Sequence, residues 1–99
     1  MSTWTFITNH ARVLMVITHD PTVRLRDIAS TLDITERATQ RIVSELVEEG
    51  YLSRKREGRR NVYTVHPTRK LRTPQTQTVE VGRFLNLLLK QGDLHVGAS

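Results

Sequence analysis

Two apolar patterns with helical spacing follow one another in residues 25–50, LRDIASTLDITERATQRIVSELVEEG. The first predicts a short helix, because its apolar residues recur at spacings of three and four: Leu25, Ile28, Ala29 and Leu32. The second predicts a helix over about 36–49, with a buried side of Ala38, Ile42 and Leu46 and, beside them, Val43 and Val47. Two helices separated by a very short turn are therefore the centre of the expected fold.

The residues at the ends of these helices fit helix-terminal chemistry, with one exception. Thr35 is a good N-cap for the second helix, and Gly50 suits the position that follows its last turn. Only Asp33 and Ile34 separate the helices, and Asp33 can adopt the positive φ that a sharp turn requires. The exception is Arg24, which occupies the N-cap position of the first helix, where Ser or Thr is expected.

The flanking segments extend this pair on both sides. Upstream, TNHARVLMVITHDP, residues 8–21, predicts a helix that starts at a polar cap and is stopped by a proline. Downstream, YLSRKREGRRNVYTVHP, residues 51–67, predicts a β-hairpin with Gly58 near its tip. A last apolar helix is expected to end at Gly92, before a frayed tail. We expect three parts: 1–66, a polar connector over 67–77, and a helix over 78–91.

Positive charge is concentrated in one part of the chain. The 99 residues carry a formal net charge of +5. Eight Lys and Arg residues and one acid lie between Tyr51 and Arg72, which gives this segment +7 and leaves −2 for the rest. Such an asymmetry indicates a localised anionic partner, with nucleic acid and an anionic membrane as the leading candidates.

The expected elements follow one another in the order helix, helix, tight turn, helix, basic hairpin and final helix. This order predicts a mainly α fold with a small β-hairpin, the winged helix-turn-helix arrangement. The stretch from Leu25 to Val65 resembles winged helix-turn-helix transcriptional regulators of the MarR and ArsR type, and the resemblance begins near Ala11. It implies a DNA-binding regulator in which the second helix of the pair enters the major groove and the hairpin, the wing, reaches the flanking backbone or the minor groove. ArsR-type metal sensing is not implied, because the chain has no cysteine and its four histidines are scattered.

Two groups of residues are predicted to contact double-stranded DNA. The exposed side of the 36–49 helix offers side chains that can read base edges, preceded by its cap: Thr35, Glu36, Arg37, Gln40, Arg41 and Ser44. The wing offers phosphate-binding side chains in RKREGRRN, residues 54–61: Arg54, Lys55, Arg56, Arg59, Arg60 and Asn61. A solvated helix face or hairpin tip also carries such residues without any partner, so it is their combination with the helix pair that favours DNA.

The ends of the chain are more apolar than a helix-turn-helix unit requires. The resemblance implies that terminal helices form the dimer interface in such regulators. We therefore expect a homodimer interface made of Trp4, Phe6, Val81, Phe84, Leu85 and Leu88. The alternative is that the last helix packs on its own domain.

Other functions find less support in the sequence. No Gly-rich phosphate loop, nucleophile elbow or paired catalytic acids are present, so we expect neither an enzyme nor a cofactor. The hairpin lacks the stacking aromatics of RNA modules and an apolar tip for membranes. A winged-helix adaptor that binds proteins instead of DNA is the main rival. The N-terminus has no secretion signal, which predicts a cytoplasmic protein. The sequence does not indicate a small-molecule effector.

Overall fold

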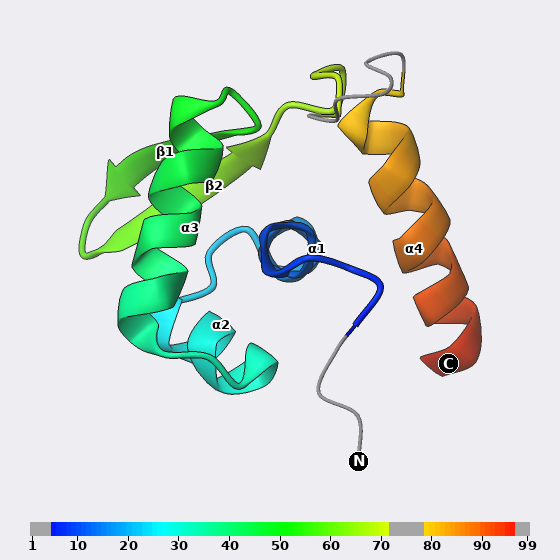
Figure 1. Cartoon of the computed structure of the whole chain (residues 1–99). Helices are drawn as coiled ribbons and strands as arrows, with labels where there is room; N and C mark the ends of the chain where they lie inside the picture. The colour runs from blue at the N-terminus through cyan, green and yellow to red at the C-terminus, as the bar shows by residue number, and fades with distance from the viewer. Residues whose placement is uncertain (1–4, 72–78, 97–99) are drawn as a thin grey trace. The chain divides into compact units, whose positions relative to one another are not determined.

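The computed structural model describes residues 5–71 and 79–96, with side chains described as far as Leu89. The chain forms two compact units, residues 1–65 and 66–99. The first unit contains five elements in the order expected from the sequence (Figure 1): α1 Asn9–His19, α2 Leu25–Leu32, α3 Glu36–Glu48, β1 Leu52–Glu57 and β2 Arg60–Val65. The described part of the second unit contains α4, Val81–Val96.

The turn between α2 and α3 has the conformation that the sequence predicts. Asp33 adopts φ 57° and ψ 48°, the left-handed region, and the Ile34 amide donates to the carbonyl of Ala29 at 3.0 Å. The Thr35 hydroxyl then accepts from the Ala38 amide at 3.0 Å and caps α3. These local bonds satisfy backbone groups that both helix ends would otherwise leave unpaired, so the two helices are joined without a flexible loop.

The C-terminal end of α3 directs the chain into the hairpin. Gly50 has φ 86° and its amide donates to Val47, while the Tyr51 amide donates back to Leu46 at 2.9 Å. This pair of bonds is a Schellman motif, and Tyr51 and Leu46, which its longer bond joins, are both buried. β1 therefore starts one residue later, with Leu52 already in the core.

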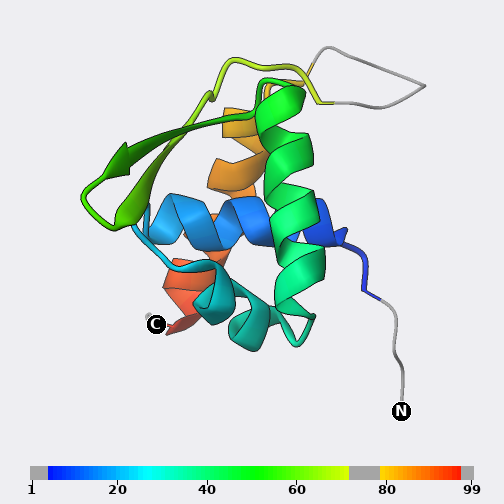
Figure 2. The same cartoon turned by 90° about the vertical axis from the view of Figure 1, so that its left-hand side faces the viewer.

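The core of the first unit lies where α1, α2 and α3 meet, with α1 crossing α3 (Figure 2). Its buried apolar residues come from the three helices and the start and middle of the hairpin: Val13, Leu14, Ile17, Ile28, Ala29, Leu32, Ile42, Val43, Leu46, Tyr51, Leu52 and Tyr63. The expected stripe of α3 needs one correction. Thr39 is 0% exposed whereas Ala38 is only half-buried, and the Thr39 hydroxyl donates to the Thr35 carbonyl at 2.9 Å, which makes its burial tolerable.

The hairpin is regular and short. β1 and β2 pair antiparallel from Leu52 opposite Val65 to Glu57 opposite Arg60. Gly58 and Arg59 form a two-residue loop, and the φ of 64° at Gly58 fits the first central position of a type II′ turn. One further bond joins β2 to the loop after α1, because the Tyr63 amide donates to the carbonyl of Pro21 at 2.9 Å.

The second unit differs from the sequence expectation in two respects. The final helix, expected over 78–91, begins at Val81 and continues past Gly92 to Val96, so Gly92 does not end it and part of the expected tail is helical. The described part of the connector, residues 67–71, is also more ordered than an extended link. Its backbone pairs with residues 79–82: Leu71 with Val79, Arg69 with Val81, and Pro67 with Gly82, each at 2.8 Å.

Candidate nucleic-acid interface

The predicted recognition residues lie together on the outer side of α3. All six of these residues are exposed: Thr35, Glu36, Arg37, Gln40, Arg41 and Ser44. The opposite side of the helix is buried and consists of Thr39, Ile42, Val43 and Leu46. A helix of 13 residues is about 20 Å long, and an α-helix fits the width of the major groove. The arrangement can therefore present Arg, Gln and Glu to base edges without disturbing the core.

One exposed residue of α3 is already engaged within the unit. The carboxylate of Glu45 lies 2.7 Å from the imidazole Nε2 of His10, at the start of α1. Both side chains are nearly half exposed, so this pair contributes little to stability, but it marks one edge of the free surface of α3.

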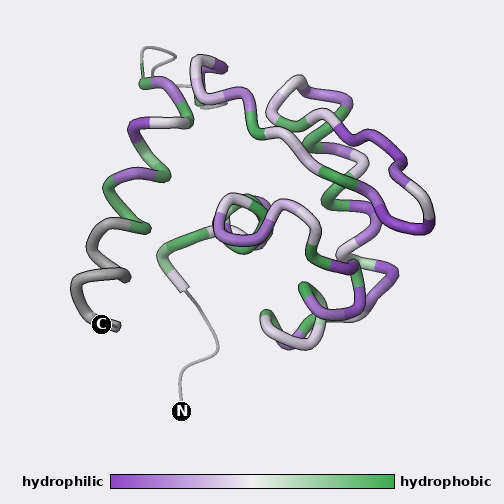
Figure 3. The backbone as a smooth tube through the Cα atoms, turned by 180° about the vertical axis from the view of Figure 1, so that it is seen from behind, coloured by the Kyte–Doolittle hydropathy of each residue, from purple (hydrophilic) through white to green (hydrophobic). Residues whose placement is uncertain are grey.

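The predicted wing residues surround the tip of the hairpin. The five basic side chains are exposed and Asn61 is half-buried. Because successive strand residues alternate between faces, the basic residues occur on both faces of the hairpin. Figure 3 shows the resulting hydrophilic tip, in purple, at the end of the two strands. One side chain stays at the loop itself, since the Arg56 Nε donates to the carbonyl of Gly58 at 3.3 Å.

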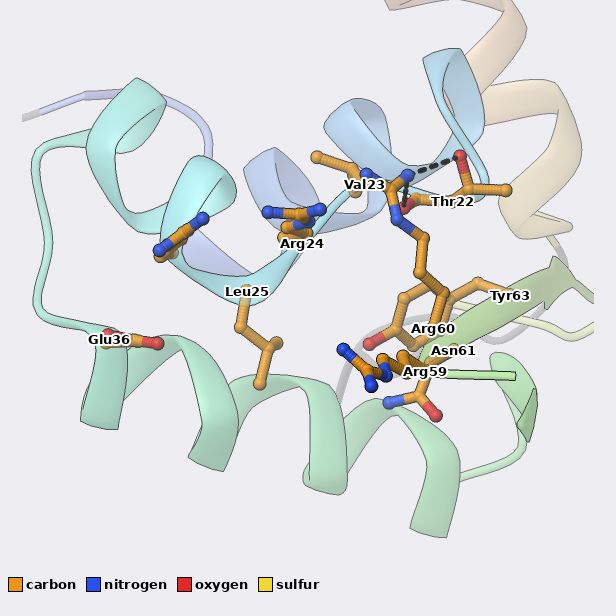
Figure 4. A pocket seen from close by; sticks show the side chains of 10 residues that line it. Thr22, Val23, Arg24, Leu25, Glu36, Arg59, Arg60, Asn61 and Tyr63 are labelled. Atoms are coloured by element: carbon orange, nitrogen blue, oxygen red, sulfur yellow. Dashed lines mark hydrogen bonds between the residues drawn. The ribbon is translucent and has the colours of Figure 1, made fainter. Parts of the chain in front are cut away.

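Arg60 lies differently from the other wing residues. Its guanidinium donates to the carbonyl oxygen of Thr22 at 3.2 Å and approaches the Thr22 hydroxyl at 3.5 Å. The sequence predicts Arg60 as a DNA contact of the wing, and in the structure its side chain is hydrogen-bonded to the loop between α1 and α2 (Figure 4). The bond holds the end of the wing close to the start of α2.

A pocket of about 350 Å³ opens between this loop, the start of α2, the start of α3 and the wing (Figure 4). Its lining has four guanidinium groups and one carboxylate: Arg24, Arg26, Arg59, Arg60 and Glu36. The remainder is formed by Thr22, Val23, Leu25, Asn61 and Tyr63. We call this pocket the arginine basin.

Arg24 and Arg26 of the arginine basin were absent from the residues predicted for the site. Arg24 takes the N-cap position of α2 but makes no capping hydrogen bond there. A cation at a helix N-terminus opposes the helix dipole, and that local misfit was the available signal. Arg24 and Arg26 lie near the wing only in the tertiary fold, and the sequence pattern does not predict which segments lie side by side.

The residues predicted for a dimer interface divide into three groups. Trp4 lies outside the described residues. Val81 and Leu85 are buried in the single chain, at 1% and 3% exposure, and Phe84 and Leu88 are half-buried. Phe6, which the prediction includes, is 90% exposed. Among the described residues, Leu87 is also a strongly exposed large apolar side chain, at 66%, and the prediction did not include it.

The described residues lack two kinds of feature. Residues 5–71 and 79–96 contain no group of three His, Cys, Asp or Glu side chains placed to hold a metal ion. Over the same ranges, no helix has both the length and the apolar character needed to cross a membrane.

Comparison with known proteins identifies the family. The MarR family model matches residues 5–60, more than half of the chain. A solved structure, a MarR protein from Peptoclostridium difficile DA00132, shares the fold with a TM-score of 0.58 and 15% identity over 90% of this chain and 52% of that one. The chain thus spans about half the length of that structure, and no curated protein matches it. The resemblance to MarR-type proteins is confirmed: the chain belongs to the MarR family, whose winged helix-turn-helix members are transcription regulators and not enzymes.

Proposed function

We propose that this protein is a sequence-specific DNA-binding transcriptional regulator that acts as a homodimer in the cytoplasm. The observation that carries the proposal is the outer side of α3, where Arg37, Gln40 and Arg41 are exposed in front of a fully packed inner side. Arg pairs bidentately with guanine and Gln with adenine in the major groove, and each good pair is worth about 1–3 kcal/mol of discrimination.

The wing supplies the second part of the proposed mechanism. Its exposed cations neutralise phosphates and release counterions, which gives affinity without reading sequence. The short turn of residues 33–35 and the capped start of α3 place the recognition side chains on a rigid helix, so little backbone freedom is lost on binding.

A homodimer is proposed from the apolar surface at the two ends of the chain. Leu87 of α4 and Phe6 near the N-terminus are large apolar side chains that remain exposed in one copy. A two-fold dimer would bind an inverted repeat whose half-sites lie about 10–10.5 base pairs apart, or a multiple of that distance.

The rival function is a winged-helix adaptor that binds proteins and has no sequence preference for DNA. Selection of bound duplexes from a random library, followed by fluorescence anisotropy on the selected and a scrambled duplex, separates the two functions. We expect an inverted repeat bound at least about 10³-fold more tightly than the scrambled duplex. Equal affinity for both duplexes would support the adaptor and end the proposal.

A further inference from the structure

The arginine basin contains cations that the described structure leaves unpaired. Arg60 is bound to Thr22, but the side chains of Arg24, Arg26 and Arg59 form no hydrogen bond or ion pair with any described residue. All three are exposed and line the same pocket of about 350 Å³. The pocket therefore holds more positive charges than its single carboxylate, Glu36, can balance, and three of its guanidinium groups make no hydrogen bond to a described residue.

The fold brings these side chains together from two distant segments. Arg24 and Arg26 belong to the start of α2, and Arg59 to the wing loop. Two hydrogen bonds hold the segments in place, from the Arg60 guanidinium to the Thr22 carbonyl at 3.2 Å and from the Tyr63 amide to the Pro21 carbonyl at 2.9 Å. The two bonds therefore link the loop before α2 to the wing, so the segments that carry the arginines of the basin lie side by side within the first unit.

Stability of the folded chain does not account for this arrangement. Arg24 and Arg26 stand at the N-cap and in the first turn of α2, where positive charge interacts unfavourably with the helix dipole. Asp27 is the only acid in that turn, and Glu36 is the only carboxylate in the basin lining. Like charges gathered around one pocket repel each other until an anion enters it.

We propose that the arginine basin binds a backbone phosphate of DNA, with Arg24, Arg26 and Arg59 as the contacting residues and Arg60 as the positioning residue. This inference rests on the proposed function. It adds a phosphate site that lies between the recognition side of α3 and the wing. Guanidinium groups match phosphate oxygens bidentately, and such charge-assisted bonds are the strongest hydrogen bonds in proteins.

The rim of the basin explains why the anion is a DNA phosphate. Glu36 belongs to the recognition side of α3 and Asn61 to the wing, so the pocket lies between the two parts of the proposed interface. A DNA strand that runs from α3 to the wing passes over it. Glu36 repels phosphates, which keeps the phosphate on the side of α2 and the wing and leaves Glu36 for a base contact.

The test compares the full chain with Arg24→Gln/Arg26→Gln in a salt titration of binding to the selected duplex. Each phosphate contact contributes about 0.9 to the slope of log K against log salt, so the double variant should lose about 1.8 per bound subunit. The preferred sequence should not change, and the melting temperature should be equal or higher, because the removed charges oppose the dipole of α2. Arg83→Gln, an exposed arginine of α4, is the control for charge alone and should leave the slope within 0.3 of wild type, a margin of roughly one third of a single contact.

The outcomes separate this inference from the proposed function. If wild type binds the duplex and the double variant has the same slope, the basin holds no phosphate and the inference is wrong while the function stands. If wild type binds no duplex, the proposed function fails first. A second measurement follows the Nε–Hε NMR signals of the arginines: shifts of Arg24, Arg26 and Arg59 with duplex support the site, and equal shifts with inorganic phosphate at the same ionic strength would overturn its assignment to DNA.

Discussion

Arg60 and Thr22, 38 residues apart in the chain, are joined by a hydrogen bond of 3.2 Å from a guanidinium nitrogen to a carbonyl oxygen. The bond connects the wing to the loop that precedes α2. It gives one of the five wing cations a structural task, so the basic run contains residues with different roles.

A matched pair of variants tests this difference. Arg60→Gln removes the bond to Thr22, whereas Arg59→Gln removes an equal charge from the neighbouring position, which has no such bond. We expect faster amide hydrogen exchange in residues 58–63 of Arg60→Gln and no change in Arg59→Gln. Both variants should remain folded, with stability losses of about 0.5–1.5 kcal/mol or less. Equal exchange rates in the two variants would show that the bond does not position the wing.

Base recognition by α3 is tested at Gln40 and Arg41. Replacement of either residue by Ala should cost about 1–3 kcal/mol on the selected duplex and much less on a scrambled one. Ser30→Ala, at an exposed position of α2 that belongs to neither group of predicted DNA contacts, is the control for the loss of a small polar group. Anisotropy measurements on both duplexes check the prediction. If the losses were equal on the two duplexes, these residues would be phosphate contacts and would not read bases.

Dimerisation is tested most sharply at Leu87. Leu87 is 66% exposed in the single chain, so Leu87→Asp should leave the fold intact and weaken only an interface that covers α4. We expect a monomer in sedimentation experiments at micromolar concentration, with an unchanged circular dichroism spectrum. Asn86→Asp, an exposed neighbour that receives the same charge, should remain dimeric if Leu87 lies in the interface.

Leu85 is unsuitable as the first test of the dimer. It is 3% exposed, and truncation of a buried Leu to Ala costs about 2–5 kcal/mol whether or not a second copy is present. A wild-type chain that sediments as a monomer would contradict the homodimer directly.

The turn between α2 and α3 allows a test of backbone strain. Asp33 has φ 57°, a region in which Asp is tolerated and a β-branched residue is not. Asp33→Val should lower the free energy of unfolding by about 1–2 kcal/mol, as expected for an ordinary side chain in the left-handed region. Asp33→Gly removes the same carboxylate but fits the conformation, so its effect should stay within about 0.5 kcal/mol because relief of strain offsets the added freedom of the unfolded chain. Urea denaturation of both variants gives the comparison, and similar losses would assign the role of Asp33 to its charge.

Much of the first unit was predictable because its signals are local. The apolar spacing in α2 and α3, the cap at Thr35 and the left-handed Asp33 depend on residues within a few positions of one another. Burial of Thr39 was not predictable from polarity, since its hydroxyl is satisfied by its own helix. The extension of α4 through Gly92 was also missed, because a glycine in a helix interior costs only about 1 kcal/mol and does not have to end the helix.

The candidate site was predictable only in part. Exposure of the α3 residues and of the hairpin tip followed from the periodicity of each element. The arginine basin required knowledge of which loop lies beside which strand. Arg24 at a helix start was visible as an anomaly, but its approach to Arg59 depends on bonds between segments far apart in sequence.

Among the six residues of β1, only Leu52 is buried, and the remaining five are exposed. The strand is anchored at its first residue, and its partner strand at Tyr63, while the positions around the tip have no role in the core. Substitutions from Arg54 to Arg59 that preserve the Gly58 turn should therefore carry little penalty in folding. The same property makes the wing a suitable place for grafting: a different hairpin tip, inserted between Ser53 and Arg60, would change the side chains that the wing exposes and leave the packed core intact.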